Sequence, residues 1–267
     1  MKFLLTNDDG VYSVGIQTMA KHLNSAGHEV LLVAPDRERS ATGHAMTLDR
    51  PVHIRKVAPQ FLSADFDAYA CDGTPTDCVI MGIDALEFIP DMVISGINQG
   101  PNLADDITYS GTACAAMEGL IFEKPSIAVS LVMSSKDKKL HNDTAAHSVM
   151  ALIESLKEDP MPEGVLYNVN VPNLPMSEIK GFSLTKKGVR RYIDKISSVK
   201  SPGGAEAYWI GGQIVDELIE GTDVWAISNS KISVTPIHLE MTSFDTYRKF
   251  KDGCVEDKLN AYLNIDM

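Results

Sequence analysis

Two adjacent carboxylates follow the first apolar segment of the chain. Residues 3–5 predict a short buried strand, and Asp8 and Asp9 come after it, just before Gly10, which permits a tight bend. Ligands gather at the carboxyl ends of strands in an open parallel sheet, so this turn is placed where a metal site would begin. Taken alone, the turn is better explained by an Asx turn and one solvated aspartate. Residues further along the chain decide between the two interpretations.

Later turns bring further oxygen-bearing side chains to the ends of predicted strands. One turn offers Ser40, and another offers Asn98 and Asn102. Together with Asp8 and Asp9 they supply carboxylate, hydroxyl and amide oxygens, which are the ligands that hard cations prefer. The pattern therefore favours Mg²⁺ or Mn²⁺ over zinc.

A phosphate site is predicted at the helix start formed by Ser110, Gly111 and Thr112. The first backbone N–H groups of a helix are unpaired and favour an anion, and a glycine there lets the anion approach closely. Ordinary capping by Ser110 explains any single residue but not the long irregular loop before the helix. Asp105 and Asp106, in that loop, are left outside the site. A cation beside this helix start predicts a phosphate ester, attacked by a metal-activated water without a histidine base.

The composition narrows the class of protein. The 267 residues include 24 Lys and Arg against 36 Asp and Glu, and the net charge of -12 argues against binding of nucleic acid polymers. The four cysteines form no C-x-x-C pair and no dense disulfide pattern, which favours a reducing compartment. No stretch is long enough to span a membrane. We expect a cytoplasmic protein with no membrane partner.

Strand and helix signals alternate over the first 170 residues. This order predicts an α/β fold, with a mostly parallel sheet between two layers of helices. The expected strands are residues 3–5, 30–33, 68–71, 92–94, 127–132 and 166–171, with a half-exposed β excursion over 46–57. Helices are expected after the aspartate turn up to residue 27, from residue 74, from residue 110 and over 145–156.

The rhythm changes after residue 172. We expect a single domain over 1–267, with its core over about 1–172 and 217–240, a protruding β-hairpin arm over about 180–216 and a C-terminal helical segment over about 241–267. One final helix is predicted from about 243 to 263. The basic cluster at 186–191 is explained by a solvated hairpin face, an anionic substrate or a partner subunit.

The ordered motifs resemble those of one known family. They are TNDDG (6–10), APDRERS (34–40), GTPTDC (73–78), SGINQGPN (95–102), YSGT (109–112) and SVTPI (233–237). In this order they resemble the SurE, or survival protein E, family of metal-dependent 5'/3'-nucleotidases. The resemblance covers most of the chain and is highly specific as a set.

The resemblance implies a Rossmann-like core and hydrolysis of nucleoside 5'/3'-monophosphates, with some members also cleaving short polyphosphate. It implies one divalent ion per subunit, Mg²⁺ or Mn²⁺, with Asp8 and Asp9 catalytic. The implied metal ligands are Asp8, Asp9, Ser40 and Asn98, and the implied phosphate or substrate contacts are Asn7, Asn98, Asn102, Ser110, Gly111 and Thr112. Homodimers or homotetramers through the arm and the C-terminal segment are also implied. The motif at 73–78 is interpreted as a site-shaping turn without a chemical step.

Three competing hypotheses stay open at this point. Asp8 could act as a nucleophile and form an aspartyl-phosphate, although two adjacent carboxylates more naturally both bind the cation. The chain could instead be a non-catalytic nucleotide-binding module, but the glycine-rich dinucleotide fingerprint is missing after the first strand. The arm and final helix could also belong to a protein whose main role is assembly.

Overall fold

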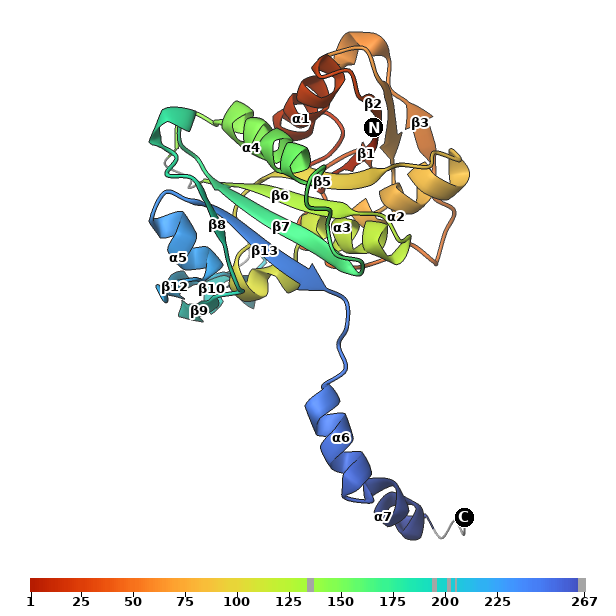
Figure 1. Ribbon diagram of the computed structural model, residues 1–267, viewed down its shortest axis with the longest axis vertical. Helices are drawn as coiled ribbons and strands as arrows, with labels where there is room; N and C mark the ends of the chain where they lie inside the picture. Colours follow the sequence, from red (N-terminus) through yellow and green to blue (C-terminus); the bar gives the residue numbers. More distant parts are fainter. Residues whose placement is uncertain (134–136, 194–195, 201–202, 205, 264–267) are drawn as a thin grey trace. The chain divides into compact units, whose positions relative to one another are not determined.

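A central sheet organises the chain, as shown by the computed structural model, which describes residues 1–133, 137–193, 196–200, 203–204 and 206–263 (Figure 1). Its described strands are β1 (Lys2–Thr6), β2 (Glu29–Pro35), β3 (Ile54–Lys56), β4 (Asp67–Cys71), β5 (Met92–Gln99), β6 (Ser126–Val132), β7 (Val165–Pro172), β8 (Phe182–Leu184) and β13 (Ile232–His238). Their order is β3-β4-β2-β1-β5-β6-β7-β13-β8. The strands from β4 to β7 run parallel, β8 runs parallel to β13, and the edge strand β3 is antiparallel to β4.

Helices cover both faces of this sheet. Figure 1 shows α1 (Val14–Ser25) and α4 (Asn142–Ser155) on one face, and α2 (Pro75–Ile80) and α3 (Gly111–Ile121) on the other. Strand β1 explains the arrangement, because successive side chains of a strand point to opposite faces. Phe3 and Leu5 pack in one apolar cluster and Leu4 packs in another, and all three are fully buried. The predicted α/β fold with its mostly parallel, doubly covered sheet is confirmed.

One predicted segment differs from the structure. Only residues 54–56 of the predicted β excursion over 46–57 form a strand, because Pro51 has no N–H to donate to a ladder and Thr47 is bonded to Asp77 instead. The part of the core expected over about 217–240 includes a short helix, α5 (Asp223–Ser228), capped by the Thr222 side chain.

The arm consists of two antiparallel strand pairs. Strands β9 (Val189–Ile193) and β12 (Gln213–Glu217) pair at its base, and β10 (Ile196–Lys200) and β11 (Glu206–Ile210) pair beyond them. The arm strands therefore begin at residue 189, because β8, inside the range expected for the arm, pairs with β13 of the main sheet. Residues 194–195, 201–202 and 205 of the expected arm lie outside the described residues.

The chain forms two units, Met1–Ile237 and His238–Met267. The second unit contains α6 (Phe244–Asp252) and α7 (Val255–Tyr262), so the prediction of one final helix is wrong. The break lies at Gly253 and Cys254, and Cys254 has a φ of 50°, which no α-helix continues through. Residues 264–267 of the expected C-terminal segment lie outside the described residues. None of the described helices has the length and apolar character needed to cross a membrane.

Replacing Leu5 by alanine should destabilise the fold strongly. Leu5 is fully buried in β1, so the substitution loses its transfer free energy and leaves a cavity, and we expect the free energy of unfolding to fall by about 2–5 kcal/mol. Urea unfolding followed by circular dichroism measures it. Leu48→Ala is the matched control, because Leu48 is 84% exposed and its loss should cost less than about 0.5 kcal/mol. Equal costs for the two variants would contradict this account of the core.

Candidate functional site

The turn after β1 is built by Asn7. The Asn7 Oδ1 atom accepts a hydrogen bond from the Gly10 N–H at 3.1 Å, while its Nδ2 donates to the Gly10 carbonyl at 3.1 Å and to Ser13 Oγ at 2.7 Å. These bonds fix the bend that presents Asp8 and Asp9. The structure thus gives the buried Asn7 side chain a turn-forming role, and its contact with substrate stays a prediction.

Four segments distant in sequence meet at the two aspartates. The Thr112 hydroxyl donates to Asp8 Oδ1 at 2.5 Å, which joins the turn to the start of α3. The Asp8 carbonyl accepts from the Arg39 N–H at 2.7 Å, which joins it to the loop after β2. Asp9 Oδ2 accepts from the Gln99 N–H at 3.1 Å, which joins it to the end of β5. The carboxyl edge of β1, β2 and β5 and one helix start therefore share a single small region.

The start of α3 lies directly against Asp8. A Cβ atom added at Gly111 would lie 3.0 Å from Asp8 Cβ and 3.0 Å from Thr42 Oγ1, and 3.2 Å from Asp8 Oδ2. A side chain at this position would therefore require Asp8 or Thr42 to move by a few tenths of an ångström. The neighbouring Ser110 hydroxyl accepts from the Ala113 N–H at 3.0 Å, so Ser110 caps the helix. Ser110 therefore caps the helix, while Gly111 makes the close contact with Asp8.

The carboxylates repel one another. Burial raises the pKa of Asp8, hydrogen bonds from Thr112 oppose that rise, and the charge of Glu38 adds to it. Burial, followed by the charges of Asp8 and Glu38, raises the pKa of Asp9 to about 6, against the lowering effect of the Gln99 N–H. Glu38 was missed by sequence reasoning, although it lies two residues before Ser40. A site in which neighbouring carboxylates raise the pKa values of Asp8 and Asp9 is a site that a cation would stabilise.

Ser40 and Asn98 lie beside this group. The exposed Ser40 hydroxyl donates to Glu38 Oε1 at 2.6 Å, and Asn98 Nδ2 donates to the Gly100 carbonyl at 3.0 Å, which leaves Asn98 Oδ1 outside that bond. In the described part of the chain, no group of three or more His, Cys, Asp or Glu side chains is placed to hold a metal ion. A cation here would therefore need the hydroxyl and amide oxygens as well as the aspartates.

Asn102 belongs to a separate buried network at the ends of β6 and β7. Its side chain donates to Ser130 Oγ at 2.8 Å, and its N–H donates to Asn170 Oδ1 at 2.9 Å. Its carbonyl accepts from Asn168 and Asn170 at 2.9 and 3.0 Å. These bonds anchor the loop that leads to α3. The structure does not bring the Asn102 side chain to the aspartates, and its substrate contact stays a prediction.

The loop after β2 is held in place by Asp77. Asp77 accepts from the Thr47 N–H at 3.0 Å and from the Thr47 hydroxyl at 2.6 Å. The same carboxylate accepts from the Thr74 N–H at 2.8 Å, which completes a capping box at the start of α2. His44, further along this loop, pairs with the buried Glu118 of α3 at 2.8 Å. The motif at 73–78 therefore fixes the loop that contains Arg39, Ser40 and Thr42.

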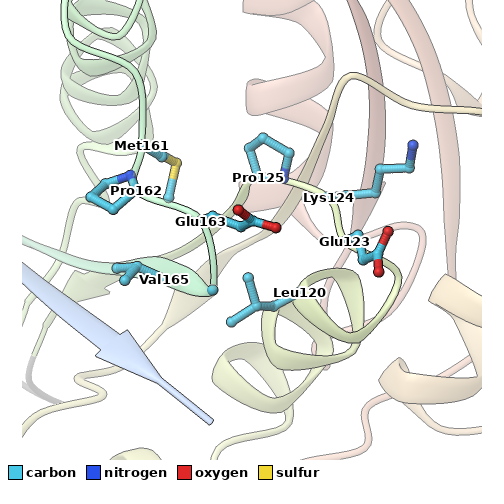
Figure 2. A pocket seen from close by; sticks show the side chains of 9 residues that line it. Leu120, Glu123, Lys124, Pro125, Met161, Pro162, Glu163 and Val165 are labelled. Carbon is cyan, nitrogen blue, oxygen red and sulfur yellow. The ribbon is translucent and has the colours of Figure 1, made fainter. Parts of the chain in front are cut away.

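A pocket of 470 Å³ at the other edge of the sheet offers different chemistry (Figure 2). It lies between the segments that precede β6 and β7, and Leu120, Pro125, Met161 and Val165 give it an apolar lining. Figure 2 shows Lys124 extending away from Leu120. This pocket lies at the amino ends of parallel strands, where the topology places no ligand site. The group around Asp8 is the candidate site.

Comparisons with known proteins identify the family of this chain. A family model described as "Survival protein SurE" matches residues 3–194. The chain belongs to the SurE family. The resemblance found in the motifs is confirmed.

Individual SurE relatives match almost the whole chain. A protein of Thermosynechococcus vestitus named 5'-nucleotidase SurE is 47% identical over 249 residues, covering 91% of this chain and 92% of its own. One of Stenotrophomonas maltophilia with the same name is 44% identical and covers 93% and 94%. The solved SurE protein of Aquifex aeolicus superposes with a TM-score of 0.80 at 40% identity, over 94% of this chain and 98% of that one.

A methyl group at Gly111 should disable the site without unfolding the protein. Gly111→Ala forces Asp8 or Thr42 to move by a few tenths of an ångström, and we expect at least a tenfold loss of phosphatase kcat/KM with an unchanged circular dichroism spectrum. Gly211→Ala is the matched control, because a Cβ atom there would meet nothing within 4 Å. Full activity of the Gly111 variant would show that the helix start does not need this close approach.

The pKa of Asp9 predicts the pH dependence of stability in chelator. The pKa of this carboxyl group rises from 3.8 in the unfolded chain to about 6 in the folded protein. The free energy of unfolding therefore falls as pH rises through that range. Asp9→Asn should remove this loss, so the variant should exceed the parent protein by about 1–2 kcal/mol at pH 7.5, allowing for the partial exposure of Asp9, and match it at pH 4. Thermal unfolding in EDTA measures the difference. Parallel pH curves for the two proteins would contradict the electrostatic account.

Proposed function

We propose that the protein is a divalent-cation-dependent phosphomonoesterase that hydrolyses nucleoside 5'- and 3'-monophosphates to nucleoside and phosphate. The protein is an enzyme of the SurE family, and relatives that match more than nine-tenths of its length carry the name 5'-nucleotidase. The single observation that carries the proposal is the contact between Asp8 and the start of α3, where Thr112 donates to Asp8 and Gly111 lies close against the Asp8 side chain.

One Mg²⁺ or Mn²⁺ ion per subunit fits the residues present. Asp8, Asp9, Ser40 and Asn98 would hold it, because they supply the oxygen ligands that hard cations take. The raised pKa values of Asp8 and Asp9 support this assignment, since the apoprotein confines negative charge that a cation would balance. When bound, the ion supplies Lewis acidity toward a phosphoryl oxygen and lowers the pKa of a water molecule.

The chain's own groups position the ester. The first backbone N–H groups of α3 have no carbonyl partner within the helix. They would bind the phosphoryl oxygens, and Gly111 would allow the phosphate to approach closely. Ser110 and Thr112 hold these donors in place, through the cap on Ala113 and the bond to Asp8. Asn7 and Asn102 would act indirectly. Asn7 would fix the aspartate turn, and Asn102 would fix the loop before the helix. We propose attack by water rather than by Asp8, because both carboxylates are needed as ligands.

We also propose an oligomeric assembly, a cytoplasmic location and a second substrate for the protein. Exposed apolar side chains on the arm, among them Ile196, Trp209 and Ile210, support assembly into a homodimer or homotetramer through the arm, together with the C-terminal segment. The free thiols Cys71, Cys78, Cys114 and Cys254 are compatible with a cytoplasmic location. Hydrolysis of short polyphosphate would use the same cation and helix start.

Hydrolysis of a nucleotide panel tests the proposed function. With Mg²⁺ or Mn²⁺ the protein should release phosphate from nucleoside monophosphates, and EDTA should abolish the release. Asp9→Asn should lower kcat/KM by at least about a hundredfold, because it removes one charge at the cation, while the fold stays intact. Asp143→Asn is the control, since Asp143 lies exposed on α4 and pairs with His22. A protein that binds nucleotides but releases no phosphate with any metal would be a binding module instead.

A further inference from the structure

Another pocket adjoins the candidate site, next to the start of α3. It measures 610 Å³ and lies between the 3-10 turn Ala104–Thr108, with the following Tyr109, and strand β9 at the base of the arm. Its walls include Asp105, Asp106, Tyr109, Arg190, Arg191 and Tyr192. All of them belong to the first unit of the chain, so the pocket is formed within one subunit.

One wall of the pocket is fixed by a buried ionic network. The Arg190 guanidinium, only 5% exposed at its side chain, bonds to Asp106 at 2.9 Å and to both oxygens of Asp216 at 2.7 and 2.8 Å. The Tyr192 hydroxyl donates to Asp106 at 2.7 Å. Burial and this bond raise the pKa of Tyr192 to about 12, so the hydroxyl keeps its proton at neutral pH. The network holds β9 of the arm against the loop that leads to α3.

The pocket is close enough to the phosphate-binding helix start to take the rest of a phosphate ester. Tyr109 directly precedes Ser110, the cap of α3. Successive Cα atoms lie about 3.8 Å apart, so the Cα of Tyr109 lies within about 7.6 Å of that of Gly111. The Tyr109 carbonyl also accepts from the Gly43 N–H at 3.1 Å, which ties it to the loop that contains Ser40. A group bonded to a phosphate at Gly111 would therefore reach Tyr109.

The exposed groups of the pocket suit a base and a sugar. The Tyr109 side chain has an aromatic face, and the residue is 68% exposed. Arg191 has a planar guanidinium on an exposed side chain, held on one side by Glu217 at 2.9 Å. Aromatic rings and guanidinium planes are the side-chain surfaces on which nucleobases stack. Asp105 and the Thr108 hydroxyl add polar atoms of the kind that bind sugar hydroxyls.

Another pocket near the carboxyl edge of the sheet suits a nucleoside less well. It measures 750 Å³, and Arg37, Arg50, Arg55 and His53 line it, with no Phe, Tyr or Trp. The pocket at Tyr109 is thus the better match for an uncharged aromatic base.

We infer that the pocket between Tyr109 and β9 is the nucleoside subsite, in which the base of a nucleoside monophosphate stacks on Tyr109 and Arg191 while its phosphate lies at the start of α3. The inference rests on the proposed function. It gives the base of the arm a direct role in substrate selection. It also makes Tyr109 and Arg191 determinants of specificity rather than catalytic residues.

Paired substrates test the subsite. Adenosine 5'-monophosphate and ribose 5-phosphate carry the same ester, but only the nucleotide has a base. Tyr109→Ala should raise KM for the nucleotide about tenfold, because it removes the stacking surface, and should leave kcat/KM for ribose 5-phosphate unchanged. Tyr109→Phe keeps the ring and should retain the nucleotide KM. Arg191→Ala should raise the nucleotide KM severalfold, whereas Glu217→Ala, which removes the same ion pair but keeps the guanidinium, should not.

The KM values decide whether the nucleoside binds in this pocket. An unchanged nucleotide KM in Tyr109→Ala would overturn the subsite, and so would an equal loss on both substrates, which would mean that Tyr109 shapes the phosphate site. Equal KM values for the two substrates in the parent protein would also overturn it. If the parent protein hydrolyses neither ester with Mg²⁺ or Mn²⁺, the proposed function fails, and isothermal titration of adenosine into the Tyr109→Ala variant then tests the pocket alone. Unchanged adenosine affinity would overturn the subsite, and weakened affinity would support it.

Discussion

The structure depends on the contact between one buried carboxylate and the first turn of a helix. Asp8 is 5% exposed, yet it lies against Gly111 and accepts a hydrogen bond from Thr112. Burial of a carboxylate costs free energy unless hydrogen bonds or a cation compensate. Here the helix start supplies part of that compensation. The same contact sets the distance between the aspartate pair and the backbone N–H groups at the start of α3, so the position of α3 on the sheet and the geometry of the candidate site cannot vary independently.

Three carboxylates of this acidic protein lie together at the candidate site. Glu38 raises the pKa values of Asp8 and Asp9, and Asp8 raises that of Asp9, in a chain that already carries a net charge of -12. Sites of this kind lower the stability of the apoprotein, and such perturbed carboxyl groups cluster at functional sites. The surrounding structure offsets the cost through fully buried strands such as β1, in which Phe3, Leu4 and Leu5 have no exposed surface.

The sequence indicated the sheet well because apolar strand runs and helical spacing have strong periodic signals. It also identified the aspartate turn and the helix start, since strand ends in a parallel sheet share one edge. It did not reveal Glu38 or Thr42, because their position depends on a loop that Asp77 holds through Thr47, thirty residues away in the sequence. Polar residues in turns are ambiguous for a related reason. The side chains of Asn7 and Asn102 have the chemistry of ligands, but Asn7 bonds to the backbone of Gly10 and Asn102 donates to the Ser130 hydroxyl. The break at Cys254 was missed because a positive φ at a non-glycine residue has no reliable sequence signal.

The capping box of α2 couples this helix to the loop that contains Ser40. A helix of six residues is too short to persist by itself, and its first turn is closed by the same Asp77 carboxylate that holds Thr47. Winding of α2 and ordering of the loop that contains Ser40 are therefore one cooperative event rather than two. A fluctuation that frays this helix would free the Asp77 carboxylate and so loosen the loop, which makes the order of the candidate site dependent on a turn that lies outside it.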